Sequence, residues 1–198
     1  LGMWLALTGA RLKAADCLIA GIATHYMPTE ILGPARAQIA GAAQTHEPER
    51  ALDSGLEALS EGAGRPKELT PENVDRINRI FALENVEAIV AALEADGSDW
   101  AKAQLTTLAT KSPQTLKVAF RQLREGAAMQ SFADEMTQEY AIGARVVQRH
   151  DFIEGVRALI VDKDNKPQWN PPTLAGVTDA MLDEIFAALP ADQEWKPL

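Results

Sequence analysis

The stretch DFIEGVRALIVDKDNKPQWNPP, residues Asp151–Pro172, joins a short amphipathic segment to a charged, proline-bearing tail. Asp151 and Glu154 have the spacing of a capping box, in which two side chains satisfy free backbone N–H groups at a helix start. Apolar residues then recur at helical spacing, at Phe152, Val156, Leu159 and Ile160. The pattern predicts a capped helix, and Pro167 prevents it from continuing into the tail.

The tail of this stretch carries two lysines, Lys163 and Lys166, followed by Trp169 and an Asn-Pro-Pro run. Bulky apolar side chains beside paired lysines suit a ligand that carries an aromatic base and phosphates. The same residue types suit ordinary packing of Phe152 and Trp169 around a solvated turn, and residue type alone favours packing. Both interpretations stay open for this stretch.

Composition is that of a soluble globular chain of one or two domains. Its 198 residues are 46% hydrophobic and 24% charged, and the formal net charge is −9. This charge argues against an extended surface for nucleic acid or an anionic membrane, although a local basic patch can still bind a small anion. Cys17 is the single cysteine, so neither an internal disulfide nor a cysteine zinc cluster can form. No apolar run approaches 18 residues, so we expect no transmembrane helix.

Helix signals follow one another along most of the chain. Thr70-Pro71 and Ser112-Pro113 each place a capping hydroxyl before a proline, a combination typical of a helix N-terminus. The ranges with helical spacing or capping residues are 1–7, 13–20, 28–43, 51–59, 70–81, 85–95, 98–108, 112–126, 131–149 and 178–189. We therefore predict a mainly helical protein.

Two features near the N-terminus indicate a missing partner. Residues 1–7 form an apolar surface with no cap before it, so we expect that an N-terminal part is missing, with an arbitrary chain boundary as the alternative. Ile22–Tyr26, IATHY, is the one strand that the sequence predicts. A lone strand cannot satisfy its own backbone groups, so it needs a sheet from elsewhere.

The residues alone supply no complete catalytic set. The sequence contains no GxSxG, P-loop or GxGxxG motif. His25, His46 and His150 have no partner at metal-ligand spacing, so we predict no metal site. Acidic pairs fit solvated helix faces, and Arg121 fits an i,i+4 ion pair with Glu125.

Three stretches together resemble the enoyl-CoA hydratase/isomerase (crotonase) superfamily, and most closely its 3-hydroxyisobutyryl-CoA hydrolase branch. LGMWLALTGARLKAADCLIAGIATHYMP, residues 1–28, is similar to the helix, LTGxRL turn, short helix and GIATH-like strand late in the crotonase core. SPQTLKVAFRQLREG, residues 112–126, resembles a family helix with a Ser-Pro start, and FxEGVRAxxxDKDxxPxW, residues 152–169, matches the hydrolase branch. The extra helices between Pro28 and Lys111 also fit this branch, because simple hydratases are shorter there.

The resemblance implies a mainly α chain, the helical C-terminal part of a crotonase-like α/β spiral fold, with at most one or two short strands near the N-terminus. Residues 1–28 would end the crotonase core as helix-turn-helix-strand, residues 29–111 would be inserted helices, and residues 112–198 would form a C-terminal helical cover. In the family, the sheet, the oxyanion-hole amides and the catalytic carboxylates lie before the LTGxRL turn. We therefore expect the catalytic residues upstream of Leu1, in the same polypeptide or a companion chain, and none in this chain.

The resemblance further implies a CoA thioester hydrolase of valine catabolism, with an acyl-CoA substrate and no cofactor, because CoA is part of the substrate. The candidate CoA contacts are Lys163 and Lys166 for the phosphates, and Trp169 and Phe152 for the cleft wall. Family C-terminal helices also build subunit contacts, which is compatible with a homo-oligomer. The expected location is the cytoplasm, or the mitochondrial matrix in a eukaryote.

Two alternatives to this function stay open. Within the family, the intact protein could be an enoyl-CoA hydratase or isomerase. From another class, the chain could be a non-catalytic helical interaction module. Whether the intact protein is a hydrolase or a hydratase or isomerase, the chain alone is expected to be inactive, since it would supply the helical cover and lack the acid–base groups.

Overall fold

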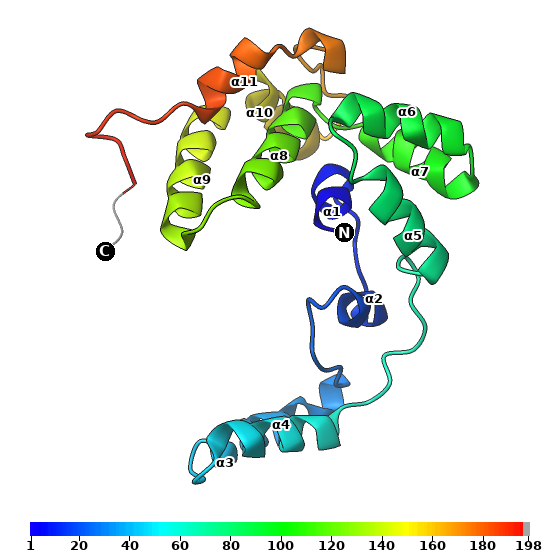
Figure 1. The fold of residues 1–198 in the computed structure, drawn as a ribbon, viewed down its shortest axis with the longest axis vertical. Coiled ribbons are helices and arrows are strands. Elements are labelled where there is room, and N and C mark those ends of the chain that lie inside the picture. The colour runs from blue at the N-terminus through cyan, green and yellow to red at the C-terminus, as the bar shows by residue number, and fades with distance from the viewer. Residues whose placement is uncertain (196–198) are drawn as a thin grey trace. The chain divides into compact units, whose positions relative to one another are not determined.

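The computed structural model describes residues 1–195, and in this range every regular element is a helix (Figure 1). The chain divides into two compact units. The larger unit combines Leu1–Ala10 with the chain from Ile77 onward, and the smaller unit is Arg11–Arg76. The chain passes from one to the other within α5, Pro71–Ile80, which starts at the predicted Thr70-Pro71 signal. The mainly helical class predicted from the sequence is confirmed.

The smaller unit contains a short helix, a 3-10 turn and a helical hairpin. These elements are α2 (Ala14–Ile19), η1 (Thr29–Ile31), α3 (Leu32–Ala42) and α4 (Pro48–Leu59). Helices α3 and α4 lie side by side (Figure 1). Gly55 permits this approach, because a Cβ added there would lie 2.0 Å from Gln38 Nε2 on the facing helix.

Asp16 fastens the loop that follows the hairpin. Its side chain is fully buried, and Oδ1 accepts the N–H groups of Lys67, Glu68 and Leu69 at 3.1, 3.0 and 2.9 Å. Oδ2 accepts the N–H of Lys13 at 3.4 Å. Burial raises the pKa of this carboxyl, but the four N–H donors outweigh burial and hold the pKa of Asp16 below its ordinary range. The ionised carboxylate therefore joins α2 to residues 67–69.

The larger unit contains most of the helices that the sequence predicted. They are α1 (Gly2–Thr8), α6 (Val86–Asp96), α7 (Asp99–Leu108), α8 (Pro113–Gly126), α9 (Phe132–Val146), α10 (His150–Val156) and α11 (Asp179–Phe186), with the π-helical turn η2 (Arg157–Val161) and the 3-10 turn η3 (Leu174–Gly176). Five of their starts are capped by a side chain that accepts a backbone N–H of the first turn: Asn85, Ser98, Ser112, Ser131 and Thr178. These bonds satisfy N–H groups that have no partner inside the helix.

Helix α1 is fixed in the larger unit by its apolar face. Trp4 and Leu7 are each 1% exposed, and Trp4 Nε1 donates to Gln104 Oε1 of α7 at 2.8 Å. Helix α1 also packs against α8. It ends at Gly9, whose φ of 68° is the left-handed conformation that glycine adopts without strain. The helix predicted over residues 1–7 is therefore confirmed.

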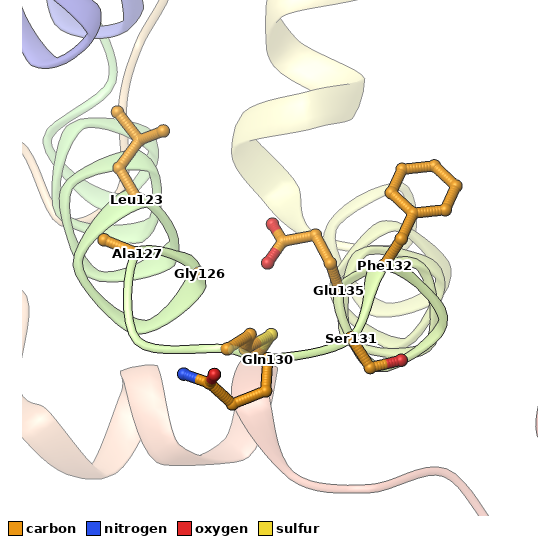
Figure 2. Close-up of a pocket in the computed structure, with 8 residues that line it drawn as sticks. Leu123, Gly126, Ala127, Gln130, Ser131, Phe132 and Glu135 are labelled. Carbon is orange, nitrogen blue, oxygen red and sulfur yellow. The ribbon is translucent and has the colours of Figure 1, made fainter.

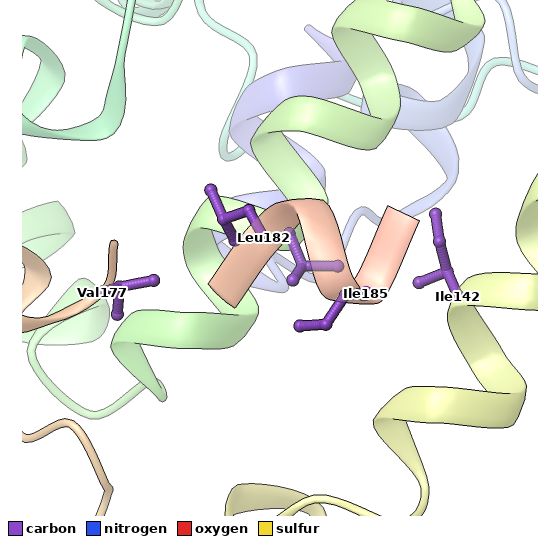
Figure 3. Close-up of a cluster of buried hydrophobic side chains, with 5 residues drawn as sticks. Ile142, Val177, Leu182 and Ile185 are labelled. Carbon is purple, nitrogen blue, oxygen red and sulfur yellow. The ribbon is translucent and has the colours of Figure 1, made fainter. Parts of the chain in front are cut away.

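A cluster of buried side chains joins α8, α9 and α11. Val118, Ile142, Val177, Leu182 and Ile185 form it, and Figure 3 shows α11 carrying Leu182 and Ile185 toward the neighbouring helices. Arg121 of α8 closes one side, because its guanidinium lies 4.4 Å from the centre of the Phe186 ring. The predicted ion pair of Arg121 with Glu125 is confirmed at 2.6 Å.

The strand predicted at Ile22–Tyr26 is wrong, because this segment forms turns and irregular backbone. The N–H groups of Ile22 and Ala23 donate to the Cys17 carbonyl at 3.0 and 3.2 Å and so complete the end of α2. The Tyr26 carbonyl accepts Ser60 Oγ at 3.2 Å and the N–H of residue 61 at 2.9 Å. Alternating β-branched residues predicted a strand, but a strand needs a paired neighbour, and residues 1–195 contain none.

The division into residues 1–28, 29–111 and 112–198 stays a prediction, because it rests on resemblance, whereas the two units are defined by contacts. Residues 196–198, the end of the third segment, lie outside the described residues. Across residues 1–195 no helix has both the length and the apolar character that a membrane crossing requires.

Candidate functional site

A groove of about 880 Å³ lies in the larger unit, where the start of α8 meets α10, η2 and the tail that follows them. Its walls come from residues 109–112 and 115 on one side and from residues within 151–160 and 165–169 on the other. Residues 109–112 and 151–169 are far apart in sequence, so their meeting depends on the fold. Ten of the 22 residues of the stretch Asp151–Pro172 line this groove.

Asp151 holds the walls of the groove together. Its side chain is buried, Ser112 Oγ donates to Oδ2, and the N–H of Asn170 donates to Oδ1 at 2.8 Å. His150 Nδ1 lies 3.0 Å from the same Oδ1. The predicted N-cap role of Asp151 is wrong, since α10 starts at His150 and its N-cap, Arg149, makes no side-chain capping bond. The carboxylate is instead used for contacts between segments distant in sequence.

The order of Ser112, Asp151 and His150 does not form a nucleophilic triad. In a triad an imidazole lies between the hydroxyl and the carboxylate, so that it can take the hydroxyl proton. Here the carboxylate lies in the middle, and Ser112 Oγ also accepts the N–H of Thr115 at 3.1 Å as the cap of α8. These contacts therefore join the segments that form the groove, and His150 does not activate Ser112.

Glu154 is also used differently from the prediction. It was expected to complete a capping box with Asp151, but its carboxylate binds Arg157 Nε at 2.9 Å and Nη2 at 2.8 Å. Its Oε1 also accepts the N–H of Gln168 at 2.7 Å, which brings the tail back against α10. The Arg157 guanidinium, followed by this backbone N–H, lowers the pKa of Glu154 to about 2.

Arg157 gathers the charged turn after η2. Its Nη1 donates to Asp162 Oδ2 and Asp164 Oδ2, both at 2.7 Å, and its Nη2 donates to the Lys166 carbonyl at 3.3 Å. Bonds to Arg157 and to the N–H of Lys166 lower the pKa of Asp164. The carboxylates of this turn are thus paired with one guanidinium, while Lys163 and Lys166 extend from the same turn.

Two lysines give the groove its positive charge. Lys166 lines it from the tail, and Lys111 lines it from the loop before α8. Within residues 1–195, neither ammonium forms an ion pair with a carboxylate. Lys111 Nζ lies beside Gly9, 3.7 Å from where a Cβ would be, at the C-terminal end of α1. Lys111 and Lys166 therefore both contribute to the lining of the groove.

Large apolar side chains form the rest of the wall. Phe152, Leu159 and Ile160 line the groove and are 46%, 58% and 65% exposed. The Trp169 ring packs over Gly155, where an added Cβ would lie 3.5 Å from Cη2, and its Nε1 donates to the Thr110 carbonyl at 3.3 Å. An exposed apolar wall beside lysines suits an amphiphilic anion.

The structure therefore brings together three of the four residues that the sequence proposed as ligand contacts. Phe152, Lys166 and Trp169 line the groove, whereas Lys163 lies on the turn outside the lining set. The packing interpretation does not describe Phe152, which is half-exposed. Sequence reasoning missed Lys111, although it directly precedes the Ser112-Pro113 helix start. Ligand contact by each of these residues stays a prediction.

A second cavity, of about 480 Å³, lies between the end of α8 and the start of α9 (Figure 2). Leu123, Ala127 and Phe132 contribute much of its apolar lining, and Glu135 is its ionisable side chain. Figure 2 shows the Glu135 carboxylate directed toward α8, where Gly126 leaves room for it. The described residues that line this cavity include no cation and no convergent polar set. Among residues 1–195, no group of three or more His, Cys, Asp or Glu side chains could hold a metal ion.

The sequence matches the family model described as enoyl-CoA hydratase/isomerase over residues 1–186. It is 42% identical over 191 residues to a mitochondrial 3-hydroxyisobutyryl-CoA hydrolase from Xenopus laevis, a match that covers 96% of this chain and 49% of the relative. The protein of the same name from Homo sapiens is 36% identical over 200 residues, with the same coverages. The chain thus spans about half the length of the curated relatives it matches.

Solved structures with a similar fold are CoA enzymes by their titles. A carnitinyl-CoA dehydratase from Mycobacterium thermoresistibile superposes with a TM-score of 0.80 at 31% identity, covering 97% of this chain and 52% of that chain. An enoyl-CoA hydratase from Rhodobacter sphaeroides 2.4.1 superposes with a TM-score of 0.77 at 30% identity, with the same coverages.

Proposed function

The chain belongs to the enoyl-CoA hydratase/isomerase family, and from this premise we propose that it is the helical, CoA-binding part of a 3-hydroxyisobutyryl-CoA hydrolase. The proposed reaction is hydrolysis of the acyl-CoA thioester in valine catabolism. Support comes from the relatives of that name, at 36% to 42% identity over 96% of this chain. In a eukaryote we expect the mitochondrial location that the names of these relatives carry.

One observation carries the proposal: the groove lining places two lysines, which form no ion pair with a carboxylate within residues 1–195, beside an apolar wall. CoA has phosphates at its nucleotide end and a long, largely uncharged arm that leads to the thioester. Lys111 and Lys166 would bind phosphate oxygens, and Phe152 and Trp169 would contact the adenine or the arm. The Asp151 oxygens already accept Ser112 Oγ and the Asn170 N–H, so they need no donor from the ligand.

We assign the thioester chemistry to protein outside this chain, in agreement with its covering about half of each relative. There, two backbone N–H groups would stabilise the thioester oxyanion and carboxylates would activate water. The present chain would be the C-terminal part that binds and covers the substrate, with its core partner in the same polypeptide or a companion chain. The groove residues of this chain would hold the CoA moiety in place.

Titration of the chain with CoA by calorimetry tests the binding role. Lys166→Met should weaken CoA binding by about fivefold, which corresponds to about 1 kcal/mol for one lost ion pair with phosphate. Pantetheine, which lacks the phosphates, should bind both proteins equally. Lys102→Met is the matched control, because Lys102 is exposed on α7 and pairs with Asp99 at 3.8 Å, outside the groove lining. Absence of CoA binding by the wild type would contradict the proposal and favour a non-catalytic helical interaction module.

The second candidate function is an enoyl-CoA hydratase or isomerase, which the titles of the structural neighbours favour. Product analysis of the intact enzyme distinguishes the two activities. A hydrolase releases free CoA and a hydroxy acid, whereas a hydratase yields a hydrated CoA ester with the thioester intact.

A further inference from the structure

We propose that Arg157 is a positioning residue for the groove: by holding the turn at residues 162–166, it places Lys166 where a bound anion can reach it. Contacts of the chain itself support the hold of Arg157 on the turn, whereas its effect on ligand binding rests on the proposed CoA site. Different measurements therefore test the hold on the turn and the effect on binding.

The Arg157 guanidinium holds both backbone groups of Lys166, the carbonyl directly and the N–H through Asp164. Arg157 Nη2 donates to the Lys166 carbonyl at 3.3 Å. Arg157 Nη1 binds Asp164 Oδ2 at 2.7 Å, and Oδ1 of the same carboxylate accepts the N–H of Lys166 at 2.8 Å. Arg157 also binds Asp162 and Glu154, so its planar fork ties the turn to α10. A lysine ammonium is a compact point charge and cannot bridge these separated acceptors at once.

The backbone of the turn needs such support. Lys163 and Asn165 have φ values of 54° and 55°, in the left-handed region that is unfavourable for residues with a Cβ. Asn165 is further held by its N–H, which donates to the Ala158 carbonyl at 3.1 Å. Such conformations persist where surrounding contacts fix them. The contacts of Arg157 with residues 162, 164 and 166 supply this fixation on both sides of the strained residues.

Charge gives a second reason why the availability of Lys166 depends on Arg157. Arg157 is the cation shared by Glu154, Asp162 and Asp164. Without its fork, these carboxylates would attract the ammonium groups of Lys163 and Lys166, which extend from the same turn. A Lys166 ammonium paired with a neighbouring carboxylate would no longer be free for a ligand in the groove. Arg157 thus keeps Lys166 available as well as correctly placed.

Amide hydrogen exchange of the ligand-free chain tests the structural statement. In Arg157→Lys, which keeps the charge, the amides of Asn165 and Lys166 should exchange at least about tenfold faster than in the wild type. Arg121→Lys is the matched control, because Arg121 also bridges two carboxylates, Glu125 and Asp183, each at 2.6 Å, but lies outside the groove. Its substitution should leave the turn unchanged. Equal exchange of the turn in wild type and Arg157→Lys would overturn the proposal.

A double-mutant cycle with CoA tests the route through Lys166. Arg157→Lys alone should weaken CoA binding by about fivefold, as does removal of Lys166. The double variant Arg157→Lys/Lys166→Met should bind no more weakly than Lys166→Met alone, because both changes remove the same contact. Additive losses would overturn the route through Lys166. A wild-type chain that does not bind CoA would refute the proposed function, whereas the exchange measurement would still decide the role of Arg157 in the turn.

Discussion

Asp151 and Glu154 lie one turn apart on α10, and each carboxylate serves a contact beyond its own helix start. Asp151 accepts Ser112 Oγ from a residue 39 positions earlier and the N–H of Asn170 from 19 positions later. Glu154 accepts the N–H of Gln168 as well as Arg157. The spacing of a capping box was present, but distant partners compete for the same oxygens. Local spacing therefore could not reveal how these side chains are used.

At the residue scale, we expect Asp151→Ala to destabilise the chain by about 2–4 kcal/mol, because the buried Ser112 hydroxyl and the partly buried Asn170 N–H would lose their acceptor. Chemical denaturation monitored by circular dichroism measures this change. Asp99→Ala is a suitable control, since Asp99 also lies in the first turn of a helix but is exposed, and its loss should change stability by less than about 0.5 kcal/mol. Equal effects of the two substitutions would show that Asp151 does not join the segments of the groove.

At the scale of elements, helices were predictable where their signals were local. Apolar spacing and a capping residue identified α6, α7, α8 and α9, because both signals lie within a few residues of the helix they form. The segment Ile22–Tyr26 carried a local strand pattern, yet its backbone groups bond to the end of α2 and to the segment after α4. Strand pairing requires two segments, so the alternating pattern of Ile22–Tyr26 alone was not sufficient to predict a strand.

The turn after η2 should respond to acid through Glu154. Its pKa is lowered from an ordinary 4.5 to about 2 in the folded chain, so its stabilising contacts are fully present above about pH 4.5 and are lost as pH falls toward 2. The groups that share this environment are Arg157, His150, Asp162 and Asp164. The Gln168 amide, followed by NMR from pH 6 to 2, should shift as Glu154 is protonated. In Glu154→Gln this transition should be absent, and an unchanged titration would assign it to another group.

At the scale of the whole molecule, the sequence predicted the family and much of the groove, and the fold supplied the rest. Phe152, Lys166 and Trp169 could be proposed together because they lie within 18 consecutive residues. Lys111 could not, since its place in the groove depends on α8 meeting α10. The larger unit also joins α1 to helices more than 75 residues away, through contacts such as Trp4 with Gln104. Such contacts follow from packing and are not visible in local patterns.

The chain of 198 residues alone should show no thioesterase activity on 3-hydroxyisobutyryl-CoA. In the groove, Ser112 Oγ donates to the Asp151 carboxylate, a weak base, and His150 contacts the other oxygen of that carboxylate instead of the serine hydroxyl. Release of free CoA, measured with a thiol reagent, checks this expectation against the intact enzyme. Turnover by the purified chain above the uncatalysed rate would show that residues 1–198 contain a catalytic site of their own.

Asp16 binds the loop at residues 67–69 through main-chain N–H groups and makes no use of the loop side chains in these bonds. The hydrogen bonds of Asp16 to the loop therefore do not depend on which side chains residues 67–69 carry. Lys67 and Glu68 can be replaced by any amino acid except proline without loss of a donor, because proline alone lacks the N–H. Positions 67 and 68 are consequently places where the sequence can vary, or where a reporter residue can be introduced, while the connection to α2 is preserved.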